Sequence, residues 1–578
     1  MMSLSALDWF LIVGLNGSII LYGVHLSRGT KRSVDWFLAA KGLPWWMVGL
    51  SMFATAVDSG DYVAVAGGAY KFGLSYISSW WLGLSIGWCL VAFFLFVPMY
   101  RAGMFTNAEY LEFRFGPVAR VISVLIQIQS RTNVMANVAF SLYLTFSVLT
   151  GWGTQTWWLI VGIALAAATY TALGGLRSVA VTDTIQSLVM ILASIVLWWT
   201  VWDHVGGWQG LENGLAQHVA SHRLAEATAH SMTHVGGLDS TNTPAVIVVL
   251  GFILALSAYC TINQSQAMRL LAARSIWDMK MAAVVAGSVT AFMMWFNVTL
   301  GVLGRVVIPD LETTDQILPT LIEQFAPTMQ AGLMGIIVAG LLAGGLSTYD
   351  SIGSALASVF TRDIYARFIR PRETDRHYLL VSRIVTVVVI LASFAYIPFL
   401  KAGMLEFYMK LAGVAVIPLF TVYLMGVFTR VARSSATIGL SVAMLTGLTR
   451  FMNPVLLEWE LGPLPVWWTD TWWGYLWSIL VTSLSMIVAS MITGWESREI
   501  FQAMAPSRET RNQPSDDSSD EETPPEGTWL ERSRQTVPTT LEGTPQASSE
   551  RTGWWLRPWI WASLLLLIVG YLNLVVFW

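Results

Sequence analysis

The sequence predicts an all-α integral membrane protein, and three observations lead to that fold class. Of the 578 residues, 55% are hydrophobic and 12% are charged, about half the charged share of a soluble domain. Apolar segments long enough to cross a bilayer recur along the whole chain. Several of these segments carry polar groups at their centre, where hydrocarbon makes such groups costly, so they indicate a path for an ion or a solute.

The apolar segments predict fourteen transmembrane helices. Each is a run of about 18 or more residues with few charges. They lie near residues 7–26, 44–70, 76–100, 118–149, 155–173, 178–203, 244–271, 281–307, 331–360, 377–400, 405–429, 435–453, 471–494 and 556–577.

The first segment begins with the acidic Asp8 and has no basic region or cleavage site, so we expect a retained helix rather than a signal peptide.

Lys and Arg follow the first, third, seventh and ninth segments, which predicts that the loops after these segments are cytoplasmic. With an even number of helices, both termini are then expected outside, in the extracellular space or periplasm. The expected location is the plasma (inner) membrane.

The second segment predicts a broken helix. Asp58, Ser59 and Asp61 interrupt it, and Gly67 and Gly68 follow. Such a sequence suits an unwound stretch, and unwound stretches in transporters expose backbone carbonyls to cations at the bilayer midplane.

The ninth segment carries the polar cluster Ser347, Thr348, Asp350 and Ser351 behind Gly344. On a helix, positions 344, 347 and 348 share one face, and so do 347, 350 and 351. Hydroxyl and carbonyl oxygens grouped in this way suit a hard cation.

Other segments contain charged groups as well. The charged groups deep in the predicted segments are four acids, Asp58, Asp61, Asp183 and Asp350, and two bases, Arg131 and Lys410. Either some of the acids are protonated or one or two bound cations complete the balance. The alternative is that several of these groups lie nearer the interface and reach water.

Two regions lie outside the apolar segments. The loop 205–243 holds four of the seven His in two i, i+4 pairs, His218/His222 and His230/His234. Such pairs could bind zinc, but no Cys or clear third ligand accompanies them, so a solvated extracellular loop is the favoured interpretation. The stretch 496–552 is polar and partly acidic, which predicts a disordered cytoplasmic linker. No basic stripe indicates nucleic acid.

Four motifs make the chain resemble the sodium/solute symporter family, which includes the sodium/sugar and sodium/proline symporters. They are YTALGGLRSVAVTDTIQ (170–186), YCTINQ (259–264), LSTYDS (346–351) with TRDIY (361–365), and GVFTR (426–430). The resemblance implies a LeuT-type core of two inverted five-helix halves, with the first and sixth core helices broken.

The resemblance also implies how the chain is divided. An extra N-terminal helix and loop occupy 1–43, the ten-helix core 44–430, two accessory helices 431–495, the linker 496–552 and a C-terminal transmembrane helix 553–578. We expect a monomer.

The resemblance implies a first sodium site between the broken first core helix and the eighth core helix. Its ligands are the carbonyls of Ala54, Val57 and Gly344 and the hydroxyls of Ser347 and Thr348. All-oxygen coordination is the expected chemistry for sodium.

Some relatives have a second sodium between the fifth and eighth core helices. The matching positions here are Asp183, Ser347, Asp350 and Ser351. Asp350 stands where the two-sodium relatives have serine, so two carboxylates could strengthen this cation site or share a proton.

The candidate solute-binding residues are Asp58, Asp61, Tyr259, Asn263 and Lys410. The resemblance places Tyr259 where sugar symporters have a pocket tyrosine, and Asp61 and Lys410 where they have glutamine. Lys410 together with Asp58 or Asp61 could hold both ends of a zwitterion. Lys410 alone could instead bind the carboxylate of a solute. Alternatively, Lys410 pairs with one of the aspartates and does not meet the solute.

We therefore expect a sodium-coupled secondary active symporter, not an enzyme. It would import a small polar organic solute, such as a sugar, an amino acid or a carboxylate, by alternating access. The alternative is a sodium-linked membrane sensor or a channel-like protein on the same fold.

Overall fold

The computed structural model describes residues 5–27, 33–236, 243–402, 404–455, 466–497 and 556–578. These residues are almost entirely helical, and within them the only strand-like pairing is an isolated parallel bridge between Leu43 and Ala273. The predicted linker 496–552 falls almost wholly outside the described residues.

The helices of the bundle follow the predicted apolar segments. They are α1 (Ala6–Ser27), α3 (Trp45–Ala56), α4 (Ser59–Phe72), a composite helix (Leu74–Arg101) that includes α5 (Ser85–Leu90) and α6 (Phe96–Arg101), α8 (Pro117–Thr150), α9 (Thr156–Val205), α12 (Ala245–Ile262), α13 (Gln264–Leu271), α14 (Ile276–Val307), α16 (Leu333–Val359), α17 (Asp375–Ser393), α18 (Met404–Phe428), α19 (Ser435–Val455), α21 (Thr471–Thr493) and α24 (Pro558–Tyr571).

Shorter helices lie between these long ones along the chain. They are α2 (Ser33–Leu38), α7 (Asn107–Phe115), α10 (Gly207–Ala220), α11 (Glu226–Thr233), α15 (Ile317–Phe325) and α20 (Val466–Thr469).

Eleven helical segments in the described part of the chain are long and apolar enough to cross a membrane. Three differences separate this number from the predicted spans, and the first is that α19, at the predicted segment 435–453, is not among the eleven. The segment 44–70 is divided into α3 and α4, and the segments 155–173 and 178–203 are continuous in α9 across a kink at Gly175. The count of fourteen therefore stays a prediction.

The kink at Gly175 requires glycine. Its φ is 70°, and a Cβ at this position would lie 2.8 Å from Cδ1 of Trp36 and 2.9 Å from its Cα. A side chain would be disfavoured by both the backbone conformation and the contact. Gly175 therefore lets α2 pack directly against the corner between the two halves of α9.

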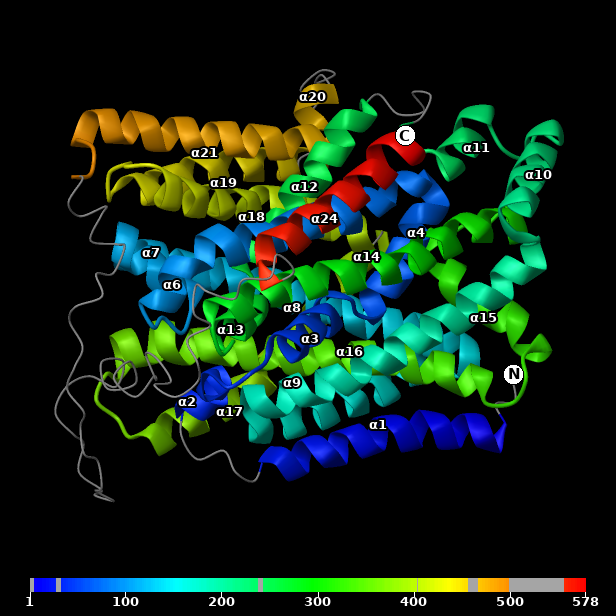
Figure 1. Cartoon of the computed structure of the whole chain (residues 1–578), viewed down its shortest axis with the longest axis horizontal. Coiled ribbons are helices and arrows are strands. Elements are labelled where there is room, and N and C mark those ends of the chain that lie inside the picture. Colours follow the sequence, from blue (N-terminus) through cyan, green and yellow to red (C-terminus); the bar gives the residue numbers. More distant parts are fainter. Residues whose placement is uncertain (1–4, 28–32, 237–242, 403, 456–465, 498–555) are drawn as a thin grey trace.

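The long helices lie side by side, with their axes roughly along the horizontal direction of Figure 1. The helix α16 packs against α9, α8 and α1, and α14 packs against α3 and α4. At the opposite edge from α1, α19 and α21 pack on each other and on α18 (Figure 1). The eighth core helix, α16, is thus enclosed by other helices.

The outer helix α1 is attached to α16 through Asp8. This carboxylate accepts the backbone N–H groups of Gly332 and Gly335, at 3.0 and 2.7 Å. The first N–H groups of a helix have no intrahelical partner, and the helix dipole favours an anion there. Asp8 therefore caps the start of α16 from another helix.

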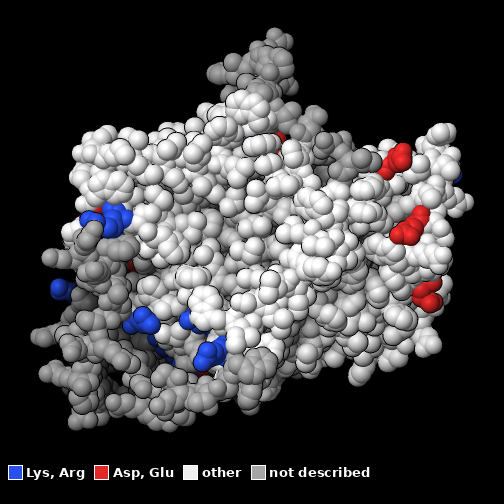
Figure 2. Space-filling view, turned by 45° about the horizontal axis from the view of Figure 1, so that its top comes forward, with Lys and Arg blue, Asp and Glu red and all other residues white. Residues whose placement is uncertain are grey.

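Charges on the surface are divided between the two ends of the bundle. In Figure 2, most visible Lys and Arg side chains lie at the left end, and the Asp and Glu side chains gather at the right end. In Figure 1, α2 and α7 lie towards the same left end as the basic residues, and α10, α11 and α15 lie at the right end with the acidic ones. The gathering of Lys and Arg at one end is the pattern that the positive-inside rule describes.

Candidate functional site

The site begins at the break between α3 and α4. Val57 (φ −117°, ψ 112°) and Asp58 (φ −124°, ψ −179°) are extended, so the helix ends at Ala56 and restarts at Ser59. The sixth core helix is broken in the same way between α12 and α13, at Asn263 (φ −76°, ψ 106°). Both breaks confirm the prediction of discontinuous core helices.

Asp58 and Asp61 form a reciprocal capping box at the start of α4. The Asp58 N–H donates to Oδ2 of Asp61 at 3.2 Å, and the Asp61 N–H donates to Oδ1 of Asp58 at 3.0 Å. In a continuous helix these N–H groups would bond to the carbonyls of Ala54 and Val57, four residues earlier. The capping box therefore leaves both carbonyls available to other partners.

The freed carbonyl of Ala54 faces α16. Ser347 Oγ lies 2.6 Å from the Ala54 oxygen and 3.0 Å from the oxygen of Gly344. A Cβ on Gly344 would lie 3.3 Å from the backbone nitrogen of Ser59, so α16 approaches the break closely at this glycine. Three of the five oxygens predicted for the first sodium site thus lie next to one another.

Thr348 connects this group of oxygens to the start of α4. Its hydroxyl donates to Oδ2 of Asp58 at 3.4 Å, and the side chain is buried. Val57, the fifth predicted residue, is buried within the break itself. The arrangement can coordinate a hard cation through carbonyl and hydroxyl oxygens.

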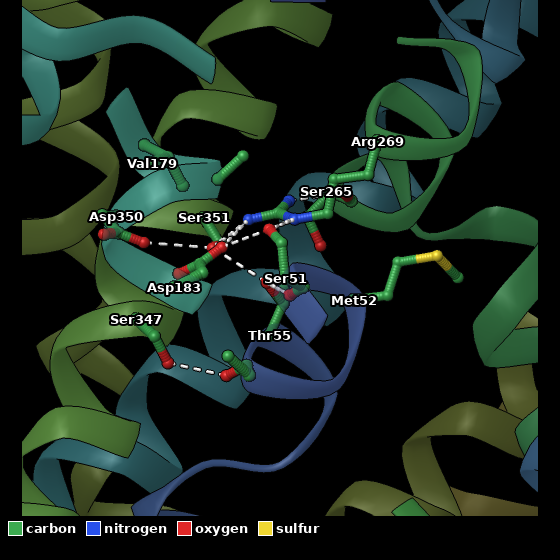
Figure 3. Close-up of polar contacts among 12 residues, drawn as sticks. Ser51, Met52, Thr55, Val179, Asp183, Ser265, Arg269, Ser347, Asp350 and Ser351 are labelled. Atoms are coloured by element: carbon green, nitrogen blue, oxygen red, sulfur yellow. Dashed lines mark hydrogen bonds and ion pairs between the residues drawn. The ribbon is translucent and has the colours of Figure 1, made fainter. Parts of the chain in front are cut away.

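A second polar cluster lies beside the first and is shown in Figure 3. Arg269 Nη2 lies 2.7 Å from Oδ2 of Asp183. The Nε of Arg269 donates to Ser51 Oγ at 2.7 Å. Ser351 accepts another hydrogen bond from Arg269 and donates to Oδ1 of Asp350 at 3.0 Å.

Tyr170 completes the cluster on the far side of Asp350. Its hydroxyl donates to Oδ2 of Asp350 at 2.8 Å. Asp183, Asp350, Ser351 and Arg269 are all fully buried. The cluster therefore holds two carboxylates and one guanidinium away from water.

Arg269 and Ser347 determine how the predicted second cation site is arranged. Arg269 is not among the residues predicted for this site, but α13 carries it into the bundle, where it pairs with Asp183. Ser347 donates to the end of α3 and not to this cluster, because its side chain lies on the α16 face that meets the break. Any second cation would share the cluster with the guanidinium.

A cavity adjoins the break between α3 and α4. Its polar lining includes Asp58, Asp61, Asn137 and Tyr259. Aromatic side chains form much of the remaining wall, namely Tyr76, Trp80, Phe252 and Tyr408. A cavity with an apolar wall and a few convergent polar groups is typical of a small-molecule site.

Two of the five residues predicted for the solute pocket do not line this cavity. Asn263 instead caps α13, since its Oδ1 accepts the N–H and the hydroxyl of Ser265 at 3.1 and 2.7 Å. On α18 the lining residues are Tyr408, Met409 and Ala412, and Lys410 falls on another face of the helix. Asp58, Asp61 and Tyr259 therefore line this cavity, and Asn263 and Lys410 do not. The solute contacts themselves stay predictions.

Arg131 supports the cavity wall from behind. Its Nη2 donates to the Tyr408 hydroxyl at 2.9 Å, and its guanidinium carbon lies 4.8 Å from the ring centroid of Tyr259. The sequence marks Arg131 as an intramembrane charge but gives it no partner, because Tyr408 is 277 residues further along the chain. The aromatic lining residues were also missed, since aromatic residues occur throughout the sequence.

The His-rich loop does not form a metal cluster in its described part. His230 and His234 stack with ring centroids 4.0 Å apart. Among the residues that the structure describes, no group of three or more His, Cys, Asp or Glu could hold a metal ion.

Together, the broken helices and the buried oxygen cluster define a multi-pass membrane transporter of the symporter class. A family model described as the sodium:solute symporter family matches residues 36–445. The chain belongs to the sodium:solute symporter family. It is a sodium-coupled symporter of small solutes and not an enzyme.

Curated relatives include sugar and cyclitol cotransporters. A sodium/mannose cotransporter, SLC5A10 of Bos taurus, is 29% identical over 475 residues, which is 74% of this chain and 76% of the relative. Sodium/myo-inositol cotransporter 2 of Homo sapiens is 27% identical over 465 residues, covering 75% of this chain and 68% of the relative.

A solved structure of a Na⁺-coupled sialic acid symporter, in a substrate-bound outward-open state, has the same fold. Its TM-score is 0.70 at 21% identity, over 85% of this chain and 99% of that chain. Mhp1, a nucleobase-cation-symport-1 family transporter, is a more distant neighbour, with a TM-score of 0.51 and 12% identity over 81% of this chain and 97% of its own.

Proposed function

We propose that the chain imports a small polyhydroxylated solute together with a sodium ion bound by Ala54, Val57, Gly344, Ser347 and Thr348. The observation that carries the proposal is the capping box of Asp58 and Asp61, which releases the carbonyls of the broken helix where α16 supplies hydroxyls. Sodium would hold the two sides of the break together next to the cavity. Each ligand then raises the affinity of the other, and the sodium gradient drives uptake.

The cavity favours a neutral polyol over a carboxylate. Asp58 and Asp61 line it, and carboxylates repel an anionic solute but accept hydrogen bonds from hydroxyl groups. Lys410 was the reason to expect an acid, and it does not line the cavity. Relatives named as mannose, glucose and myo-inositol cotransporters support the same class of solute.

A second coupling cation would belong to the cluster of Asp183, Asp350 and Ser351. Two buried carboxylates next to one guanidinium leave one negative charge to be compensated. A sodium ion or a proton shared by the carboxylates would balance it. We propose such a site, with Arg269 as a permanent neighbour of the ion.

The expected topology and assembly also belong to this proposal. We infer that the end of the bundle with α7 faces the cytoplasm of a plasma (inner) membrane and that both chain termini lie outside. The basic end in Figure 2 supports this orientation, as does the position of the N and C labels beside α15 and α11 in Figure 1. The transport unit is proposed to be a monomer.

The experiment that tests the function is a thermal-shift screen of the purified full chain. Mannose, glucose, myo-inositol, amino acids and carboxylates are each added in sodium and, at equal ionic strength, in potassium. A bound ligand stabilises the protein by RT ln(1 + [L]/Kd), so a polyol should raise the melting temperature in sodium much more than in potassium. Stabilisation by a carboxylate alone, or equal effects in both salts, would contradict the proposal.

A further inference from the structure

We propose that the Asp58 carboxylate supplies the negative charge of the first sodium site, so that this residue serves the ion and Asp61 serves the solute. The inference rests on the proposed sodium site between α3, α4 and α16 and adds a residue to it. Asp58 lies between the two ligands, since its side chain contacts Thr348 and also lines the solute cavity.

The position of the Asp58 carboxylate is fixed by its role as the N-cap of α4. Oδ1 accepts the Asp61 N–H at 3.0 Å, which leaves Oδ2 directed at the Thr348 hydroxyl at 3.4 Å. The backbone at Asp58 is also close to α16, because a Cβ on Gly344 would lie 3.5 Å from the Asp58 carbonyl carbon. Asp58 is 4% exposed, so the carboxylate is largely removed from water.

Thr348 connects this charge to the ion. When its hydroxyl donates its hydrogen to Asp58, the lone pairs on its oxygen remain free for a cation. A carboxylate next to a site of carbonyl and hydroxyl oxygens also strengthens binding, since the charge of the ligand set tunes the affinity of oxygen sites for hard cations.

Asp61 differs from Asp58 although the two belong to one capping box. It is more exposed to the cavity, and its Oδ2 accepts the Asp58 N–H at 3.2 Å rather than a group on α16. Its backbone carbonyl accepts the side-chain amide of Asn297 on α14. Asp61 is therefore placed to receive hydroxyl donors of the solute.

The test compares Asp58→Asn with Asp61→Asn in the purified full chain. Asparagine keeps the shape and the N-cap of Asp58 but removes its charge. The melting temperature is measured while sodium chloride replaces potassium chloride at constant ionic strength and without solute. We expect the sodium concentration for half-maximal stabilisation to rise about tenfold or more in Asp58→Asn and less than about twofold in Asp61→Asn.

A purely structural role would lower the melting temperature of Asp58→Asn in potassium without changing its dependence on sodium. That result, or an equal loss of sodium affinity in Asp61→Asn, would overturn the inference while leaving the proposed sodium site intact. If the wild type shows no sodium-specific stabilisation, the sodium site itself is wrong. Asp58→Ser, which also caps a helix without charge, provides a second variant with the same expected shift should Asp58→Asn not fold.

Discussion

Two reciprocal hydrogen bonds between Asp58 and Asp61 decide which backbone oxygens of the broken helix can meet a cation. Without them, the N–H groups of both residues would satisfy the carbonyls of Ala54 and Val57 and continue the helix. With them, the Ala54 carbonyl lies 2.6 Å from Ser347 Oγ. The proposed sodium site is thus built by side chains that cap one helix and by hydroxyls on another.

The double change Ser347→Ala and Thr348→Ala should weaken sodium dependence of uptake by about tenfold or more, which is about 1.4 kcal/mol, because two of the five proposed ligand oxygens are lost. Uptake of the solute found in the screen is measured against sodium concentration. Ser358→Ala is the matched control, since this buried hydroxyl on α16 has no hydrogen-bond partner in the described part of the chain. Unchanged sodium dependence in the double variant would refute the site.

Asp350→Asn should change how many charges move with each solute molecule more than it changes solute affinity. The substitution removes the surplus negative charge of the cluster with Asp183 and Arg269, and with it the reason for a second cation. Current and solute flux are measured together in vesicles over a range of pH. Tyr170→Phe, which removes the hydroxyl donor to Asp350 but keeps the carboxylate, serves as the control.

The charge stoichiometry and pH profile of Asp350→Asn decide the role of this residue. If both match the wild type, Asp350 has only a structural role.

Among the helices, interruptions matter more for the site than length does. The breaks between α3 and α4 and between α12 and α13 bring polar backbone to the middle of the bundle, where other helices supply its partners. The kink at Gly175 in α9 turns the chain while Trp36 packs against the corner.

Gly175→Ala should destabilise the protein by about 1–3 kcal/mol, since alanine at φ 70° is strained and its Cβ would lie 2.8 Å from Trp36. The matched control is Gly162→Ala in the same helix, where a Cβ meets no atom within 4 Å and alanine favours the helix. Thermal unfolding in detergent measures both. An equally stable Gly175→Ala would show that the corner relaxes without cost.

In the bundle as a whole, basic residues gather at one end and acidic residues at the other (Figure 2). Ion pairs also connect the segments at the basic end. Arg120 pairs with Glu112 and Asp363, and Arg367 pairs with Glu112, which joins α7, the start of α8 and the segment after α16. The charge asymmetry and these ion pairs both belong to the end proposed to face the cytoplasm.

Cysteine labelling tests this orientation. In intact cells, an impermeant maleimide should label Ser221→Cys, after α10, and should label Arg372→Cys, before α17, only after permeabilisation. Both positions are exposed, whereas the native Cys89 and Cys260 are buried and should give a low background. The reverse labelling pattern would invert the topology.

Local sequence is sufficient for the membrane class, the helical segments, the broken core helices and the family. Hydropathy reflects the environment of each segment directly, and the motif around Asp58 and Asp61 interrupts a helix through neighbours in the chain. The hydroxyl face of α16 could be predicted for the same reason, because Gly344, Ser347 and Thr348 lie within about one turn.

Tertiary packing alone decides which charges meet. Arg269 reaches Asp183 across 86 residues, and Arg131 reaches Tyr408 across 277. Lys410 stays off the cavity because the rotation of α18 turns Tyr408 and Met409 towards it instead. Helix rotation and contacts between distant segments depend on how all the helices pack at once, so no local pattern contains them.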